Sequence, residues 1–312
     1  MTAPPVVFLM GPTASGKTDL ALALHERLPL DIVSVDSAMV YRGMDIGTAK
    51  PSREVLARVP HRLIDICDPA EAYSAGRFRA DAREAIRDIH AAGRIPLLVG
   101  GTGLYFRSLE QGFSRLPPSD PAIRDALEQE ADLKGWKQMH ALLAKIDPIS
   151  AKKIHPNDPQ RIQRALEVYR ITGRPLSALV GGGREGGLDS PLIKIVVAPA
   201  ERGRLHEAIR RRFFAMLEAE LLEEVKGLYE RGDLHAGLPA MRLVGYRQAW
   251  QYLAGELDYN SMISKAITAT RQLAKRQLTW LRAERDARWF DSGSKPLEEA
   301  VLTFLQHEPV FS

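Results

Sequence analysis

The sequence predicts an α/β protein: a P-loop core with a mostly parallel sheet flanked by helices, plus a helical insertion domain. Three observations support this fold class. Short apolar runs alternate with helical patterns over the first hundred residues, which is typical of a parallel sheet covered by helices. A glycine-rich loop follows the first apolar run. A long stretch without strand signals then separates this region from a later apolar run.

The expected strands are the apolar runs, and the expected helices are the segments with helical periodicity. Buried strands are predicted at 6–10, 31–35, 95–99 and 191–199, with less regular strands at 61–66 and 287–290. Helices are predicted at 17–28, 74–92 and 258–285. The chain after Pro199 is otherwise expected to be mostly helical.

The character of the chain changes after residue 116. The segment RLPPSD is rich in proline, the residues that follow it have helical patterns only, and the segment GGGREGG at 181–187 is expected to be flexible. The sequence therefore predicts a core made of residues 1–116 and 191–312, and a helical insertion domain at 117–190.

The composition is that of an ordinary soluble protein. A net charge of +4 permits nucleic-acid binding without requiring it. No apolar run approaches the roughly 18 residues that cross a bilayer, and the N-terminus lacks the basic region of a signal peptide. The single Cys67 excludes an intramolecular disulfide and a multi-cysteine zinc site. We therefore expect a cytoplasmic protein without a membrane partner, and a monomer.

The glycine-rich loop GPTASGKT matches the phosphate-binding pattern G-x-x-x-x-G-K-T. Its glycines let successive N–H groups point inward, and the helix that follows adds a partial positive charge. Lys17 is expected to reach the outer phosphate oxygens, and the Thr18 hydroxyl is expected to ligate Mg²⁺. The expected phosphate-binding residues are Gly11, Pro12, Thr13, Ala14, Ser15, Gly16, Lys17 and Thr18.

Asp36 directly follows the predicted strand 31–35, at the strand end where open α/β sheets bind ligands. P-loop NTPases usually hold Mg²⁺ with a second acidic residue at such a strand end. The run at 95–99 is followed instead by Gly-Gly-Thr, which contains no acid. Asp36 is therefore a metal-associated acid, a general base or a capping residue, and spacing alone does not separate these roles.

Seven motifs carry a more specific signal. They are GPTASGKT (11–18), DSAMVYRGMDIGTAKP (36–51), PHRLID (60–65), LLVGGTGLY (97–105), HPNDPQRIQRALEVYRITGRP (155–175), RLVGYRQ (242–248) and ATRQLAKRQLTWLR (269–282). In this order they make the chain resemble the tRNA dimethylallyltransferases, also called tRNA isopentenyltransferases, over nearly its whole length.

The resemblance implies that the loop holds the diphosphate of dimethylallyl diphosphate. It implies transfer of the five-carbon group to N6 of the adenosine at position 37 of tRNA, next to the anticodon, with Mg²⁺ as cofactor. By the same resemblance Asp36 is the general base, and Thr102 and Arg212 lie near the leaving diphosphate. The choice of Arg212 over Arg210 and Arg211 rests on the resemblance alone. The single cysteine and the end at residue 312 match the shorter bacterial form, which has no zinc finger.

Most of the expected tRNA contacts also come from the resemblance. They are Asp36, Ser37, Ala38, Met39, Thr102, Arg124, Gln160, Arg161, Ile162, Gln163, Arg164, Met241, Arg242, Leu243, Val244, Gly245 and Tyr246. Arg271, Lys275 and Arg282 are added from helical spacing, because they form one basic stripe that suits an RNA backbone. We expect contacts with the anticodon stem-loop.

A few residues need a separate comment. Met39 stands where many family members carry Gln, so a side-chain amide contact to the target base is not expected from it. His155 is interpreted as a cap or turn residue, because no other metal ligand lies near it in the sequence. Tyr246, Trp250 and Trp280 are expected to be core residues or part of a stacking surface.

Three other functions compete with this interpretation. A P-loop nucleotide or small-molecule kinase shares the loop and the sheet, but it does not explain the helical insertion or the basic segment near residue 275. An enzyme that prenylates free AMP or ATP is expected to lack the HPNDPQRIQR segment. An RNA-binding module with a relic loop is disfavoured by the intact Gly16-Lys17-Thr18 and Asp36.

Overall fold

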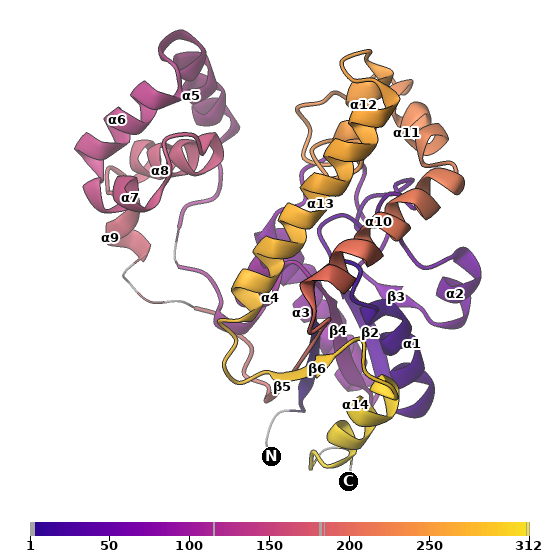
Figure 1. Ribbon diagram of the computed structural model, residues 1–312. Coiled ribbons are helices and arrows are strands. Elements are labelled where there is room, and N and C mark those ends of the chain that lie inside the picture. Colours follow the sequence, from indigo (N-terminus) through magenta and orange to yellow (C-terminus); the bar gives the residue numbers. More distant parts are fainter. Residues whose placement is uncertain (1–3, 115, 181–182, 184, 310, 312) are drawn as a thin grey trace. The chain divides into compact units, whose positions relative to one another are not determined.

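The computed structural model describes residues 4–114, 116–180, 183, 185–309 and 311 (Figure 1). The chain forms two compact units, one made of Met1–Arg107 and Asp189–Ser312 and one made of Ser108–Leu188. The first corresponds to the core expected from the sequence and the second to the insertion, although the second unit begins nine residues before the boundary expected at 117. Within the glycine-rich segment, residues 181, 182 and 184 lie outside the described residues.

The core unit is built on one sheet, which has six strands in the described part of the chain. The strands are β1 (Val6–Met10), β2 (Leu30–Val35), β3 (His61–Arg62), β4 (Ile95–Gly100), β5 (Leu192–Ala198) and β6 (Arg288–Asp291). Their order is β3-β2-β4-β1-β5-β6, and every pair is parallel. The predicted α/β fold class is therefore confirmed.

The register of three central strands positions the site. Gly100 at the end of β4 is aligned with Met10 in β1 and with Val35 in β2. The chain segments that follow these strands therefore emerge together at one edge of the sheet. A Cβ atom at Gly100 would lie 2.0 Å from the carbonyl oxygen of Val35, so only glycine fits between the strands there.

One predicted strand is much shorter than expected. The apolar segment 61–66 contributes only the two residues of β3. Leu63 and Asp65 have φ angles of 66° and 57°, which are incompatible with an extended strand. The backbone turns away from the sheet at this point and carries Asp65 toward the loop after β2, where the Asp65 N–H donates to the carbonyl oxygen of Met39.

Helices cover the sheet and extend beyond it (Figure 1). They are α1 (Lys17–Arg27), α2 (Arg53–Arg58), α3 (Ala75–Ala91), α4 (Gly103–Gln111), α10 (Arg202–Glu218), α11 (Leu221–Tyr229), α12 (Tyr246–Leu253), α13 (Tyr259–Leu281) and α14 (Leu297–Gln306). Side chains of Ser74 and Asp258 cap α3 and α13 at their N-termini. Helices α10 and α13 pack side by side. None of the helices in the described part of the chain combines the length and apolar character of a bilayer-spanning segment.

The insertion unit has its own small core. Its helices are α5 (Pro121–Lys134), α6 (Trp136–Ile146), α7 (Pro148–Lys153), α8 (Pro159–Thr172) and α9 (Leu176–Val180). Three of them begin in the same way, with a capping aspartate followed by proline at the first helical position. Leu127, Met139, Leu143 and Ile162 are fully buried between these helices. The helical character predicted for this segment is confirmed.

Candidate active site

The glycine-rich loop connects β1 to α1 at the carboxyl edge of the sheet. Gly16 has a φ angle of 80° at the N-cap of α1, a left-handed conformation that favours glycine. A Cβ atom at Gly11 would lie only 2.2 Å from the carbonyl oxygen of Val197 in the neighbouring strand β5. The Lys17 Nζ atom donates a hydrogen bond to the Pro12 carbonyl oxygen at 2.6 Å. The strand, loop and helix therefore have the order that a phosphate-binding loop requires.

Lys17 is a buried cation beside another cation. Burial, and to a lesser extent the nearby Arg212, lower the pKa of Lys17 to about 7, while Asp36 acts in the opposite direction. Burial also lowers the pKa of Arg212, again opposed by Asp36. Asp36 does not offset the cost of burying these two cations, so this part of the site favours the binding of an additional anion.

The loops that follow β2 and β4 are joined by a hydrogen bond between Ser37, the neighbour of Asp36, and Thr102. The Asp36 Oδ1 atom accepts from the N–H of Ala38 at 2.8 Å, so Asp36 does cap a turn with one carboxylate oxygen. The N–H of Ser37 donates to the Thr102 Oγ1 atom at 3.2 Å. Asp36 and Thr102, which are 66 positions apart in the sequence, thereby lie close together and line the same cavity.

Two of the cavities at this edge of the sheet have Asp36 in their lining. The larger has a volume of about 400 Å³, and its lining includes Asp36, Thr102, Arg212 and Trp280. The smaller has a volume of about 70 Å³, and its lining includes the phosphate-loop residues Lys17 and Thr18. Five residues line both cavities: Thr13, Asp36, Gly101, Arg212 and Gln277. The three residues expected to be catalytic from the sequence therefore lie around one small region.

The donor atoms near the phosphate loop suit Mg²⁺ only in part. Thr18 and Asp36 both line the smaller cavity and offer one hydroxyl and one carboxylate. Within the described ranges, no three His, Cys, Asp or Glu side chains come together as a metal site. Such a sparse set fits an ion that keeps several waters and binds mainly through phosphate oxygens, which is typical of Mg²⁺.

The segment 241–246 lies beside the larger cavity. Arg242, Leu243, Val244, Gly245 and Tyr246 line it, whereas Met241 is buried elsewhere.

The three aromatic residues singled out from the sequence have different positions. Tyr246 is completely buried and donates from its hydroxyl to the Glu224 Oε1 atom at 2.5 Å, so it is a core residue. Trp250 is buried against Tyr229, with ring centroids 4.7 Å apart. Trp280 is half-buried and, like Tyr246, lines the larger cavity.

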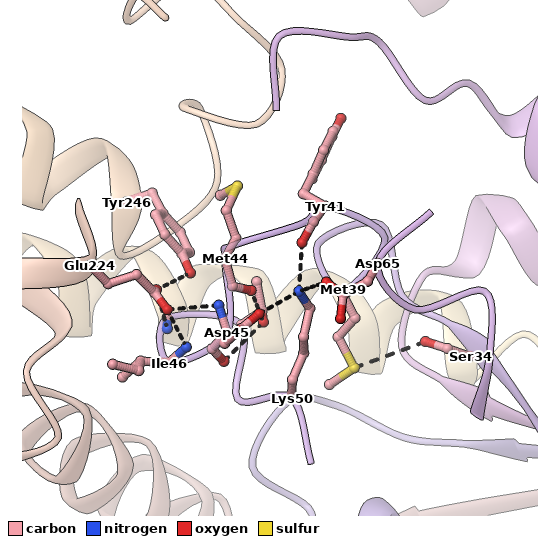
Figure 2. Close-up of polar contacts among 12 residues, drawn as sticks. Ser34, Met39, Tyr41, Met44, Asp45, Ile46, Lys50, Asp65, Glu224 and Tyr246 are labelled. Carbon is pink, nitrogen blue, oxygen red and sulfur yellow. Dashed lines mark hydrogen bonds and ion pairs between the residues drawn. The ribbon is translucent and has the colours of Figure 1, made fainter. Parts of the chain in front are cut away.

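Glu224 of α11 accepts hydrogen bonds from the loop between β2 and α2 (Figure 2). The Glu224 carboxylate accepts from the N–H groups of Asp45 and Ile46, both at 2.7 Å, and of Gly47 at 3.1 Å. Together with the bond from Tyr246, this carboxylate satisfies four donors. Sequence reasoning missed Glu224 because it belongs to none of the seven motifs and its partners lie far away in the chain.

Lys50, whose side chain is only 2% exposed, connects three parts of the same region (Figure 2). Its Nζ atom donates to the carbonyl oxygen of Tyr41 and to the carboxylates of Asp45 and Asp65, at 2.5, 2.7 and 2.5 Å. A buried ammonium with three oxygen partners fixes the loop conformation. The segment 36–51 is thus a rigid support for Asp36.

Met39 lies on the phosphate-loop side of this support. Its Sδ atom is 3.9 Å from the Ser34 hydroxyl oxygen (Figure 2). Met39 lines the smaller cavity, whereas Asp36, Ser37 and Ala38 line the larger one.

In the insertion unit, several residues expected to bind tRNA have protein partners. The Glu167 carboxylate is fully buried and pairs with Arg124 at 2.9 Å and with Arg164 at 2.7 Å. Gln163 donates to the carbonyl oxygen of Arg124. Ile162 is fully buried in the core of the unit. These side chains stabilise the unit, which motif matching alone did not reveal.

Other members of that set are exposed. Gln160 is exposed, and the Arg161 side chain is 72% exposed with a loose ion pair to Asp158. His155 is a turn residue, as expected from the sequence, because its Nδ1 atom accepts from the N–H of Asn157 at 3.1 Å.

The basic stripe of α13 is uneven. Lys275 and Arg282 are exposed, whereas Arg271 is half-buried, and among the described residues its Nε atom has no hydrogen-bond partner. Helix α13 ends at Leu281, so Arg282 is its C-cap. Two neighbours that sequence reasoning did not single out, Arg276 and Gln277, line the larger cavity. Their signal was membership in the motif 269–282.

Comparisons with known proteins agree with this geometry. The model of the IPP transferase family matches residues 39–284. A tRNA dimethylallyltransferase of Thioalkalivibrio sulfidiphilus is 65% identical over 280 residues, which is 90% of this chain and 88% of the relative. One from Nitrosococcus oceani is 61% identical and covers 94% of this chain and 93% of the relative.

Solved structures give the same assignment. The tRNA isopentenylpyrophosphate transferase of Bacillus halodurans is 37% identical with a TM-score of 0.70, covering 97% of this chain and 94% of that one. A eukaryotic dimethylallyltransferase acting on tRNA is 26% identical with a TM-score of 0.80, covering 97% of this chain and 79% of that one. The predicted resemblance is confirmed, and the chain belongs to the IPP transferase family.

Proposed function

We propose that this protein is a tRNA dimethylallyltransferase that moves the dimethylallyl group of dimethylallyl diphosphate to N6 of adenosine 37 in tRNA. The products are N6-(dimethylallyl)adenosine and diphosphate. The observation that carries this proposal is that Asp36, Thr102 and Arg212 all line the larger cavity. Asp36 and Arg212 also line the smaller cavity, together with the phosphate-loop residues Lys17 and Thr18. The names of the relatives, and the tRNA on which the eukaryotic neighbour acts, support the acceptor.

Asp36 is proposed as the general base. The exocyclic N6 of adenine is a poor nucleophile because its lone pair is delocalised into the ring. Removal of one N6 proton by the Asp36 carboxylate, as the bond between N6 and C1 of the dimethylallyl group forms, restores nucleophilic character. The position of Asp36 in the wall of both cavities supports this role, since donor and acceptor can approach it from different sides.

The leaving group gains negative charge as its bond to C1 breaks. Lys17, Arg212 and the N–H groups of the loop are proposed to stabilise that charge. The low pKa of Lys17 supports this role, because a buried ammonium gains most from an arriving anion. The Thr102 hydroxyl is a further donor beside the reacting atoms. The Thr18 hydroxyl and the diphosphate would hold Mg²⁺, which would supply additional charge neutralisation when bound.

The larger cavity is proposed to receive the target base. A base must leave its stack to react, which costs least in a single-stranded loop such as the anticodon loop. Residues 242–246 and Trp280 in the cavity wall offer backbone groups and a ring for such a base. Exposed Gln160, Arg161 and Lys275 are proposed to contact tRNA phosphates. We propose a monomeric enzyme that acts in the cytoplasm.

The deciding experiment incubates the protein with Mg²⁺, radiolabelled dimethylallyl diphosphate and unmodified tRNA, with AMP and ATP as parallel acceptors. Label on tRNA alone is expected, and it should disappear when A37 is replaced by G. Label on AMP or ATP would instead indicate an enzyme that prenylates free nucleotides. ATP consumption without transfer of label would indicate a kinase. Tight tRNA binding without any turnover would indicate an RNA-binding module.

A further inference from the structure

Gln277 of α13 connects two loops of the active site. The N–H of Thr13 in the phosphate loop donates to the Gln277 Oε1 atom at 2.9 Å. The Gln277 Nε2 atom donates to the carbonyl oxygen of Gly101, in the loop after β4, at 3.1 Å. One amide side chain thereby uses its acceptor and one donor on two loops that belong to different strands.

Helix α13 packs closely on the loop after β4. A Cβ atom at Gly101 would lie 2.4 Å from Gln277 Nε2, and one at Gly103 would lie 2.5 Å from the Trp280 ring. The helix therefore presses directly on both neighbours of Thr102.

Thr102 in turn holds the Asp36 segment. Its Oγ1 atom accepts from the N–H of Ser37, the residue that follows Asp36. Hydrogen bonds thus connect Thr13 to Gln277 and Gln277 to Gly101. The next residue, Thr102, is hydrogen-bonded to the Asp36 segment. Gln277 also lines both cavities, so it stands where the two reactants would meet.

We propose that Gln277 is a positioning residue that sets the distance between the phosphate loop and the loop carrying Thr102. It thereby aligns Asp36 and Thr102 with the leaving diphosphate, a role that rests on the proposed function. Loss of this alignment slows the transfer step itself, since a displacement of about 1 Å can cost on the order of a hundredfold in rate. Affinity for either substrate changes little, because neither hydrogen bond of Gln277 has to be given up on binding.

The test compares Gln277→Met and Gln277→Glu with the matched controls Gln272→Met and Gln272→Glu, which change an exposed residue of the same helix. Methionine keeps the length of the side chain and removes both hydrogen bonds. Glutamate keeps the shape and the acceptor, but it replaces the donor to Gly101 with a second oxygen. Measurements are the single-turnover rate of prenyl transfer, the KM for each substrate and the melting temperature.

Both Gln277 variants are expected to slow single-turnover transfer by roughly ten- to a hundredfold, with each KM within about threefold of wild type. The Gln272 variants should match wild type. An unchanged transfer rate in a folded Gln277 variant would overturn the proposal, and so would a loss confined to the KM for tRNA, which would make Gln277 a tRNA contact. Failure of the proposed function is distinguishable, because the wild-type protein itself would then transfer no label to tRNA.

Discussion

Two pairs of cationic side chains, one in each unit, differ in how fully the protein compensates their charge. In the core, burial lowers the pKa of both Lys17 and Arg212, and the opposing effect of Asp36 is smaller. In the insertion, Arg124 and Arg164 share the fully buried Glu167. Burial alone would raise the pKa of Glu167, but the hydrogen bonds from both arginines outweigh it, and the pKa is lowered.

This difference separates ligand-binding cations from structural ones. A cation that lacks full compensation within the protein is prepared for an anionic ligand, whereas a cation with its own buried carboxylate already has a partner. Motifs of similar appearance in the sequence thus serve different purposes. The comparison leads to five predictions, and the first concerns the carboxylate of the core.

Asp36→Asn should abolish most of the turnover while leaving tRNA binding intact. Asparagine keeps an oxygen that accepts from the Ala38 N–H, so the turn is retained and only the base is lost. We expect a reduction of about 10²- to 10⁴-fold in single-turnover transfer, the range of general-base catalysis. Filter binding of tRNA is the control. A near-normal rate would remove Asp36 as the base.

Glu167→Ala tests the structural role of the arginines in the insertion. Removal of a buried carboxylate that is paired with two cations should lower the free energy of unfolding by about 3 kcal/mol, as measured by urea denaturation. Glu128→Ala, at an exposed position of α5, is the matched control and should have little effect. Unchanged stability combined with altered tRNA affinity would show that Arg124 and Arg164 serve the ligand, and the comparison would fail.

The contribution of Glu167 to the free energy of unfolding should decrease as the pH falls. Because the pKa of Glu167 is lower in the folded protein than in the unfolded chain, its contribution is complete above the unfolded pKa and is lost as the pH falls through the folded one. The stabilities of wild type and Glu167→Ala should therefore converge in acid.

Lys17 should take up a proton when dimethylallyl diphosphate binds. With a pKa of about 7, Lys17 is mostly neutral at pH 8, and a bound diphosphate favours the charged form. The expected uptake is about 0.9 proton at pH 8 and about 0.1 at pH 6. Calorimetry in buffers of different ionisation enthalpy measures it. Lys17→Arg is the control, because arginine stays charged. Equal uptake at both pH values would contradict the prediction.

The smallest expected effects concern exposed cations. Arg161→Ala and Lys275→Ala should each reduce the slope of log K for tRNA against log salt by roughly one. Arg164→Ala should reduce it less, because Arg164 is paired with Glu167. Equal slopes for Arg161→Ala and wild type would put Arg161 outside the interface. An equal reduction for Arg164→Ala would mean that its ion pair opens when RNA binds.

Much of the core was predictable from the sequence because it depends on local patterns. Apolar runs identified the long strands, and the loop GPTASGKT identified the phosphate site. Asp36 was found because it ends a strand of a parallel sheet. The strand predicted at 61–66 was too long, which shows the limit of this reasoning. The positive φ angles of Leu63 and Asp65 end the strand, and hydrophobic periodicity does not reveal such angles.

The sequence by itself therefore determined the fold class, the phosphate loop, the catalytic candidates and the family. Only the tertiary structure decided which polar side chains are free to act. Glu224 binds three backbone N–H groups some 180 residues away, Glu167 occupies two arginines of a motif, and Gln277 joins two loops. Strand register and helix packing bring such partners together. Sequence periodicity shows which face of an element is buried, but it does not show which side chains form hydrogen bonds between distant segments.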